Sequence, residues 1–250
     1  MARSTGRKPL ITGVNQLLVK KSMKLSVLIP VYNEEATLKE IISRVRATGV
    51  VHEIVVIDDG STDRTSDILD RLKHSDTPSL HLLKHETNQG KGAAIRTGLE
   101  SVTGDFVLVQ DADLEYNPDE YQTLLDPLSD PEVKVVYGSR NLQRNPRSSV
   151  FFYWGGRLLS WITNILYGAR ITDEATGYKI IHTPLLRQLK LEGDGFEFCP
   201  EVTGKLLRQG IPIYEVPISY TPRSWDAGKK IQWYDGLIAI WTLIKYRFKS

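Results

Sequence analysis

Gln110-Asp111-Ala112-Asp113-Leu114-Glu115 directly follows the apolar run Phe106-Val107-Leu108-Val109. The short apolar run predicts a buried strand, and the strand ends in three clustered carboxylates. Asp111 and Asp113 lie two positions apart, so an extended or turning backbone can aim both at one ion, and Ala112 leaves room between them. The pattern favours a divalent-cation site at the rim of a sheet, with a solvated strand end as the alternative.

A second acidic strand end, Ile54-Val55-Val56-Ile57-Asp58-Asp59-Gly60-Ser61, strengthens this interpretation. Residues 25–140 alternate apolar runs with amphipathic segments, which predicts an α/β fold with a mostly parallel sheet flanked by helices. In such sheets ligands bind beyond the carboxyl ends of the strands, where these acids lie. The expected strands are Leu25–Pro30, Glu53–Asp58, Leu80–Leu83, Phe106–Gln110 and Val133–Gly138. The expected helices are Glu35–Thr48, Gly90–Ser101 and Pro118–Leu128. A further helix is expected to be capped by Ser61 or Thr62 and to end at Leu72.

The composition is that of a globular enzyme with one catalytic domain. The 250 residues are 41% hydrophobic and 25% charged, with a net charge of +2, which suffices for one sizeable core. Cys199 is the single cysteine, so an intrachain disulfide is excluded. The five histidines have no zinc-site spacing.

Basic residues gather at both ends of the chain. Residues 1–23 are expected to form a basic, flexible arm without the apolar core of a signal peptide, and Lys245, Arg247 and Lys249 end the chain. The pattern indicates an anionic partner surface, and no nucleic-acid recognition motif accompanies it. We therefore expect a cytoplasmic protein that is peripheral at the cytoplasmic face of a membrane, with no nucleic-acid partner.

The second half predicts amphipathic helices. An aromatic-rich helix is expected over Val150–Tyr167, a strand over Ile213–Tyr220, and a final helix over Tyr234–Phe248. The first helix is interrupted by polar residues and glycines, so it is expected to lie in a membrane interface or in the core instead of spanning a bilayer. The last helix has the same two interpretations: a membrane surface with anionic lipids, or packing on the sheet.

Several motifs occur together in order. They are Val27-Leu28-Ile29-Pro30-Val31-Tyr32-Asn33-Glu34-Glu35, Val56-Ile57-Asp58-Asp59-Gly60-Ser61-Thr62-Asp63, Asn88-Gln89-Gly90-Lys91-Gly92 and Asp111-Ala112-Asp113, followed by Gly138-Ser139-Arg140, Thr172-Asp173-Glu174-Ala175-Thr176-Gly177-Tyr178-Lys179 and Arg223-Ser224-Trp225-Asp226-Ala227-Gly228-Lys229-Lys230-Ile231. Over residues 24–248 the chain resembles family 2 glycosyltransferases of the Rossmann-like GT-A fold. The resemblance is strongest to dolichyl-phosphate and polyprenyl-phosphate sugar synthases.

The resemblance implies that residues 24–140 bind a nucleotide sugar with Mg²⁺ or Mn²⁺. A hard cation held by oxygen ligands can stabilise a departing nucleotide diphosphate. Asp113 is the expected main ligand, Asp111 a ligand or sugar contact, and Glu115 a further ligand, where close relatives can carry glutamine. The other expected donor-binding residues are Pro30, Tyr32, Glu34, Asp58, Asp59, Lys91 and Ala112. A capping role for Asp58 and a structural role for the Gly90–Gly92 loop are the alternatives.

Residues 141–250 are then the acceptor-binding half. A phosphate monoester is already ionised near neutral pH, so a lipid-phosphate acceptor needs cations and no catalytic base. The expected acceptor-phosphate residues are Arg140, Arg157, Arg223, Lys229 and Asp173, with Lys230 beside them. A solvated or membrane-facing charge is the alternative for Arg157 and the favoured interpretation for Arg144 and Arg147. Asp173 is alternatively a buried aspartate that organises Thr176 and Lys179. The segment from Arg223 to Ile231 resembles a flexible loop that closes over both substrates.

The sequence thus predicts an inverting, metal-dependent glycosyltransferase with Asp111, Asp113, Arg140 and Arg223 as its catalytic residues. It would move mannose or glucose from a GDP- or UDP-linked donor to polyprenyl or dolichyl phosphate. Two alternatives remain. One is transfer to a soluble or saccharide acceptor, with Asp173 or Glu201 as the base, and the other is a nucleotide-sugar-binding scaffold without turnover.

Overall fold

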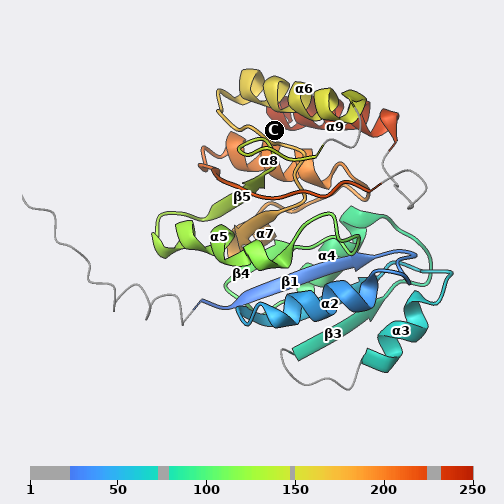
Figure 1. Cartoon of the computed structure of the whole chain (residues 1–250). Helices are drawn as coiled ribbons and strands as arrows, with labels where there is room; N and C mark the ends of the chain where they lie inside the picture. Colours follow the sequence, from blue (N-terminus) through green and yellow to red (C-terminus); the bar gives the residue numbers. More distant parts are fainter. Residues whose placement is uncertain (1–22, 73–78, 147–149, 224–231, 250) are drawn as a thin grey trace, which may run out of the picture.

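The computed structural model describes residues 23–72, 79–146, 150–223 and 232–249. Within these ranges, a seven-stranded mixed sheet in the order β3-β2-β1-β4-β6-β5-β7 runs through the molecule (Figure 1). Its strands come from both halves of the chain, so the expected donor and acceptor halves share one sheet.

The first half confirms the predicted parallel arrangement. Strand β1 pairs with β2 and β4, and β2 pairs with β3, all in parallel. The bounds are Leu25–Val31 for β1, Val51–Asp58 for β2, Ser79–Lys84 for β3 and Phe106–Val109 for β4; α2 spans Leu38–Ala47, α3 Thr65–Leu72 and α4 Lys91–Ser101. These bounds lie within a few residues of the predicted ones, because each strand is centred on apolar residues and is bounded by turn residues.

The second half differs from the prediction because an antiparallel strand enters the sheet. Strand β6, Lys179–His182, lies antiparallel between β4 and β5, and β7, Tyr214–Pro217, runs parallel to β5, Val135–Ser139. Helices α7, Thr183–Gln188, and α8, Phe198–Arg208, were not predicted either. Four residues of β6 carry too little periodicity to be recognised as a strand.

Two predicted helix features are wrong. The helix expected over Pro118–Leu128 is divided into the 3₁₀ turn Pro118–Glu120, α5 (Tyr121–Leu125) and the 3₁₀ turn Asp126–Ser129. Pro127 lacks an amide hydrogen and cannot continue the α-helical ladder. Helix α3 begins at Thr65, well after Ser61 and Thr62, and the Asp63 carboxylate accepts a hydrogen bond from the Thr65 amide at 2.9 Å.

Apolar helix faces cover both sides of the sheet. Helices α2, α3 and α5 pack on one face, and α4, α7 and α8 pack on the other. Helices α6, Val150–Tyr167, and α9, Trp233–Phe248, lie together beyond α8 (Figure 1). Their shared contact is built on Leu159, Ala239 and Leu243.

The strand register brings the acidic strand ends together. Val31 pairs with Asp58, and Leu28 pairs with Val109, so the carboxyl ends of β2 and β4 flank that of β1. The chain builds β1 to β3 on one side and then returns to place β4 on the other side of β1. This reversal is the topological switch point where open α/β sheets bind ligands.

Candidate active site

A large cavity opens at the switch point. Its volume is about 1540 Å³, and it extends from the ends of β1, β2 and β4 to helices α6 and α9. Nearly all of the predicted site residues line it: Pro30, Tyr32, Glu34, Asp59, Lys91, Asp111, Ala112, Asp113, Glu115, Arg140, Arg157, Asp173 and Arg223. Asp58 does not line the cavity, and Lys229 and Lys230 lie outside the described residues.

Gln110 anchors the acidic strand end. Its buried side-chain oxygen accepts hydrogen bonds from the hydroxyls of Tyr121 and Tyr178, both at 2.7 Å, and its amide group donates to the Asp111 carbonyl at 3.0 Å. Leu114 adopts a positive φ of 60°, an uncommon conformation that turns the chain directly after Asp113. This fixed turn holds Asp111 and Asp113 at the cavity wall.

The two aspartates differ in their electrostatic surroundings. Lys91 forms an ion pair with Asp111. Burial alone would lower the pKa of Lys91, but the Asp111 carboxylate outweighs this and raises the pKa above its ordinary value. Burial, followed by repulsion from Asp111 and Glu115, raises the pKa of Asp113 to about 7. A carboxylate under such repulsion is stabilised by an added cation.

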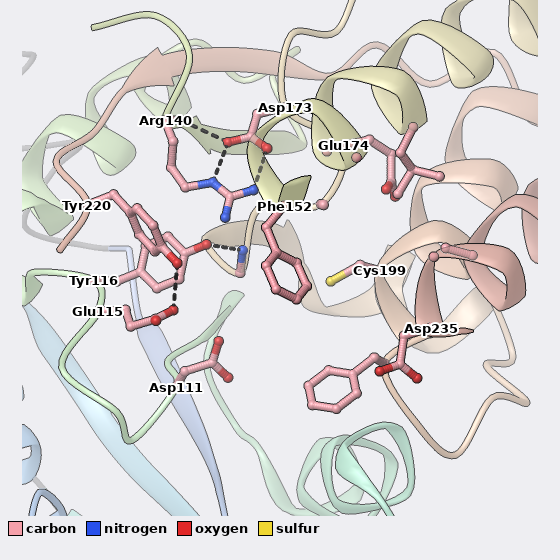
Figure 2. Close-up of a pocket in the computed structure, with 18 of the residues that line it drawn as sticks. Asp111, Glu115, Tyr116, Arg140, Phe152, Asp173, Glu174, Cys199, Tyr220 and Asp235 are labelled. Atoms are coloured by element: carbon pink, nitrogen blue, oxygen red, sulfur yellow. Dashed lines mark hydrogen bonds and ion pairs between the residues drawn. The ribbon is translucent and has the colours of Figure 1, made fainter. Parts of the chain in front are cut away.

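Glu115 is occupied by the 220–223 segment. The Tyr220 hydroxyl donates to Glu115 Oε2 at 2.9 Å (Figure 2). The Arg223 amide donates to Glu115 Oε1 at 2.7 Å. Among the described residues, no three carboxylate, histidine or cysteine groups are arranged to hold a metal ion by themselves. Mg²⁺ in nucleotide sites is commonly held by only one or two carboxylates, with phosphate oxygens and water in the remaining positions. The assignment of Glu115 as a ligand stays a prediction.

Arg223 lies between Glu34 and the acidic turn. Its Nη2 atom lies 2.6 Å from Glu34 Oε2, and its Nε atom donates to the Asp113 carbonyl at 3.0 Å. These contacts join the end of β1 to the acidic turn. They favour a donor-side role for Arg223 over the predicted acceptor-side role.

The two adjacent aspartates after β2 serve different loops. Asp58 accepts hydrogen bonds from the Ser61 amide at 2.9 Å and from the Ser66 hydroxyl, so it organises the loop between β2 and α3, whereas the Thr65 amide at the start of α3 is bound by Asp63 and not by Asp58. Asp59 accepts the amides of Gln89 and Gly90 at 2.9 and 2.8 Å and so holds the turn before α4. Nucleoside binding by either residue stays a prediction, and only Asp59 lines the cavity.

The Gly90-Lys91-Gly92 turn packs closely on the chain itself. A Cβ atom at Gly90 would collide with the Asp194 carbonyl oxygen, and one at Gly92 with the Gly193 carbonyl oxygen. The two glycines therefore allow close backbone-to-backbone packing, which supports a structural role for the Gly90–Gly92 loop. Lys91 alone projects from this turn into the cavity wall.

Arg140 is held rigidly by Asp173. Its Nε and Nη2 atoms donate to the two carboxylate oxygens of Asp173, each at 2.7 Å, and its guanidinium lies 5.1 Å from the centre of the Tyr220 ring (Figure 2). Burial would raise the pKa of Asp173, but Arg140 lowers it below its ordinary value. Asp173 is therefore an ionised partner of Arg140, and the interpretation that it organises Thr176 and Lys179 is not supported by its contacts.

The other predicted polar residues separate into two groups. Arg144 and Arg157 are exposed and line the cavity, while Arg147 lies outside the described residues. Glu201 lies away from the cavity lining and is buried in α8, where it accepts hydrogen bonds from two amides, Lys205 and Tyr246. A carboxylate with four donors is a structural anchor, which disfavours Glu201 as a base.

Sequence reasoning missed several residues of the cavity wall. Gly177 lies against Asp111, because a Cβ atom there would be 2.8 Å from Asp111 Oδ2, and its amide donates to the Tyr116 hydroxyl at 2.8 Å. Tyr116 stacks on Tyr178 with 4.7 Å between the ring centres. Glu174 also lines the cavity. Glu174 and Gly177 belong to the quoted motif from Thr172 to Lys179, and Tyr116 directly follows Glu115, but none of the three was singled out as a site residue.

Helices α6 and α9 turn large apolar side chains outward beside the cavity mouth. Trp154, Leu158, Trp233 and Leu237 are each about half exposed or more and also line the cavity. The exposed apolar face continues through Trp161, Ile165, Tyr234, Ile238, Trp241 and Phe248. In the part of the chain that the structure describes, neither these nor other helices are long and apolar enough to cross a bilayer.

Known proteins share this sequence and fold. The sequence model for "Glycosyl transferase family 2" matches residues 26–187. The chain is 32% identical over 220 residues to undecaprenyl-phosphate mannosyltransferase of Micrococcus luteus, covering 83% of this chain and 87% of that protein. It is 31% identical over 228 residues to polyprenol monophosphomannose synthase of Mycolicibacterium smegmatis, covering 87% and 84%.

Solved structures agree on the fold. A crystal structure of glucosyl-3-phosphoglycerate synthase from Mycobacterium tuberculosis with UDP has a TM-score of 0.70 and 21% identity, covering 97% of this chain and 87% of that one. A complex of the same enzyme with Mn²⁺, UDP-glucose and phosphoglyceric acid has a TM-score of 0.70 and 22% identity, covering 97% and 86%. The fold and the acidic switch-point cavity define a glycosyltransferase of the GT-A class. Within this class, the chain belongs to glycosyltransferase family 2.

Proposed function

We propose that the protein transfers mannose or glucose from a GDP- or UDP-linked donor to polyprenyl or dolichyl phosphate. The observation that carries this proposal is one continuous cavity that joins the Asp111–Asp113 strand end, the Arg140 guanidinium and the exposed apolar faces of α6 and α9. An acceptor with an anionic head and an apolar tail matches the Arg140 guanidinium and the apolar faces of α6 and α9, respectively. The names of the two bacterial relatives support the same substrate class.

Asp111 and Asp113 fit a divalent cation, Mg²⁺ or Mn²⁺, on the donor side. Both line the cavity, and the pKa of Asp113 is raised by burial and, after that, by repulsion from the neighbouring carboxylates Asp111 and Glu115. The bound cation would act as a Lewis acid that stabilises the leaving nucleotide diphosphate. Lys91 and Arg223 lie beside these carboxylates and can balance phosphate charge that enters with the donor.

Arg140 is the best-supported contact for the acceptor phosphate. Asp173 fixes two of its guanidinium nitrogens, so the group is held in one orientation before a ligand arrives. Such preorganisation lowers the cost of binding a phosphate. The ionised phosphate oxygen can then attack the anomeric carbon directly, and a single displacement inverts its configuration. Arg157 and Arg144 provide further positive charge at the cavity mouth.

The contacts of the two alternative bases disfavour a soluble hydroxyl acceptor. Asp173 is ion-paired with Arg140, and Glu201 is saturated with donors away from the cavity lining. A hydroxyl acceptor needs a carboxylate that is free to take its proton. The intact acidic turn likewise disfavours a scaffold without turnover.

Peripheral contact with a membrane on its cytoplasmic face is part of the proposal. Exposed tryptophans on α6 and α9 suit the headgroup region of a bilayer, and the cavity opens beside them. Lys245 and Lys249 pair with Glu192, so the basic end of α9 is partly neutralised within the protein. The apolar face is therefore the stronger argument for this contact.

Transfer of labelled hexose into an organic phase tests the proposal. The purified chain is incubated with Mg²⁺ or Mn²⁺, polyprenyl phosphate and a panel of radiolabelled GDP- and UDP-sugars, followed by solvent extraction. The proposal predicts metal-dependent label in the organic phase. Label only in a new water-soluble product would favour the soluble acceptor, and no transfer from any donor of the panel would contradict the proposal.

A further inference from the structure

Tyr220 connects two parts of the cavity wall that the proposed reaction uses for different substrates. Its hydroxyl donates to Glu115 Oε2 at 2.9 Å, and its ring centre lies 5.1 Å from the guanidinium carbon of Arg140. Figure 2 shows Tyr220 between Arg140 and Glu115, and all three residues line the cavity. Arg140 is the proposed contact for the acceptor phosphate, and Glu115 belongs to the acidic strand end on which the donor is proposed to bind.

The backbone around Tyr220 is fixed on the same two sides. The Thr221 amide donates to the Glu115 carbonyl at 2.9 Å, and the Tyr220 amide donates to Asn145 Oδ1 at 2.9 Å. The side-chain amide of Asn145 in turn donates to the Arg140 carbonyl at 2.8 Å. Because the backbone, the ring and the hydroxyl all have partners, Tyr220 is held in one orientation.

The ring and the hydroxyl of Tyr220 make different kinds of interaction. The Arg140 guanidinium lies over the aromatic ring, which attracts the cation, while Asp173 binds the Nε and Nη2 edge of the same group. The hydroxyl donates to a carboxylate, which gives the stronger, charge-assisted type of hydrogen bond. Hydrogen-bond partners of this type orient the carboxylates of metal sites. The two interactions use different atoms of one side chain, so they can be removed separately.

We propose that Tyr220 is a positioning residue that orients Glu115 through its hydroxyl and Arg140 through its ring. This inference rests on the proposed function and adds a link between its donor and acceptor sides. The hydroxyl supports binding of the metal and nucleotide of the donor, and the ring supports binding of the acceptor phosphate. One side chain thereby sets how the two substrates lie relative to each other.

Calorimetric binding to the full chain separates the two roles without requiring turnover. One ligand is Mn²⁺ together with GDP or UDP, and the other is farnesyl phosphate, a short prenyl phosphate. Tyr220→Phe removes only the hydroxyl, so we expect roughly 10-fold weaker binding of Mn²⁺ with the nucleotide and farnesyl phosphate affinity within about twofold of the wild type. Tyr220→Leu also removes the ring, so farnesyl phosphate should bind about 3- to 10-fold more weakly.

Tyr246→Phe is the matched control. The Tyr246 hydroxyl donates to Glu201 Oε1 at 2.8 Å, which is the same type of bond, but these two residues lie outside the cavity lining. This variant should lower the Tm by about 2–4 °C for the lost hydrogen bond while both affinities stay unchanged. In a Glu115→Ala background, Tyr220→Phe should cause no further loss of affinity for Mn²⁺ with the nucleotide, because the hydroxyl acts through Glu115.

Four outcomes would overturn the role of Tyr220 when the wild type binds both ligands. They are unchanged binding of Mn²⁺ with the nucleotide in a folded Tyr220→Phe variant, equal losses of both ligands in that variant, unchanged farnesyl phosphate affinity in Tyr220→Leu, or the same losses in Tyr246→Phe. A wild-type chain that binds neither ligand would contradict the proposed function itself, and the inference with it.

Discussion

Asp113 is both partly buried and close to other carboxylates. Its pKa is raised to about 7 by burial and by Asp111 and Glu115. We expect Asp113→Asn to reduce metal-dependent turnover at least about 100-fold, because the electrostatic stabilisation of the leaving group is lost. The Tm should stay unchanged or rise, since the substitution relieves repulsion.

Steady-state transfer assays and thermal unfolding check this prediction. Glu132→Gln, at an exposed site outside the cavity, is the control. Wild-type turnover in a folded Asp113→Asn variant would refute its assignment as a metal ligand.

Gly177 leaves space that Asp111 needs. A Cβ atom there would lie 2.8 Å from Asp111 Oδ2 and 3.0 Å from the Tyr116 ring, so a methyl group must displace one of them. We expect Gly177→Ala to lower kcat/KM about tenfold or more and to cost about 1–3 kcal/mol of stability through overpacking. Gly155→Ala, at an open position in helix α6, should raise the unfolding free energy instead. Equal stability effects in the two variants would contradict this explanation.

The ion pair between Arg140 and Asp173 contributes stability that depends on pH. Because the pKa of Asp173 is lowered in the folded state, its contribution is present above the ordinary aspartate pKa and is lost as the pH falls through the lower folded value. We expect Asp173→Asn to cost about 3 kcal/mol at neutral pH, since Arg140 is left without its buried partner. Denaturant titrations of both proteins across acidic pH should show this difference shrinking towards low pH. A difference that is constant with pH would rule out the ion pair as its source.

Helices α6 and α9 at the cavity mouth expose apolar faces of the kind that most proteins bury. Helix α9 buries Ala239, Thr242, Leu243 and Tyr246, and it leaves Trp241 65% exposed. The sequence periodicity of α9 was compatible with packing on the sheet or with contact with a membrane. In the structure its largest side chains point outward, which favours membrane contact. Helix α6 does the same with Trp161, which is 61% exposed.

We therefore expect the double variant Trp161→Ser/Trp241→Ser to bind vesicles of phosphatidylcholine and phosphatidylglycerol about tenfold more weakly, because two large apolar side chains no longer leave water on binding. Co-sedimentation measures this binding, and circular dichroism should show an unchanged fold. Leu142→Ser alters an exposed apolar residue outside these helices and is the control. Equal vesicle binding by all three proteins would show that this face does not contact the bilayer.

The elements of the first half of the chain were predictable, whereas several of those in the second half were not. Strands β1, β2 and β4 each contain an unbroken apolar run, Val27–Ile29, Ile54–Ile57 and Phe106–Val109, so the local pattern located the strands and the acidic ends of β2 and β4. Strand β6 owes its place to pairing with β4 and β5 from opposite sides, which local pattern does not encode. The segment Pro118–Leu128 shows the same limit of local pattern. Pro127 was visible in the sequence, but whether it ends the helix depends on the chain around it.

At the scale of the whole molecule, long-range contacts complete the cavity. Arg223 reaches Glu34 across 189 positions of the chain, and Tyr220 reaches Glu115 across 105. Motif order correctly placed Asp111 and Asp113 at the cavity. It did not reveal that Glu115 secures the 220–223 segment, or that Glu174 and Gly177 form part of the wall, because these roles arise only when distant segments meet.

The central claim is that the Asp111–Asp113 strand end binds the cation and the diphosphate of the donor. Anomalous diffraction from crystals of the full chain soaked with Mn²⁺ and either GDP or UDP tests it most directly. We predict one strong manganese peak within coordination distance of Asp113 and of the nucleotide diphosphate, with the base beside Pro30 and Tyr32. A manganese or nucleotide site elsewhere on the molecule, with this turn still empty, would contradict the claim.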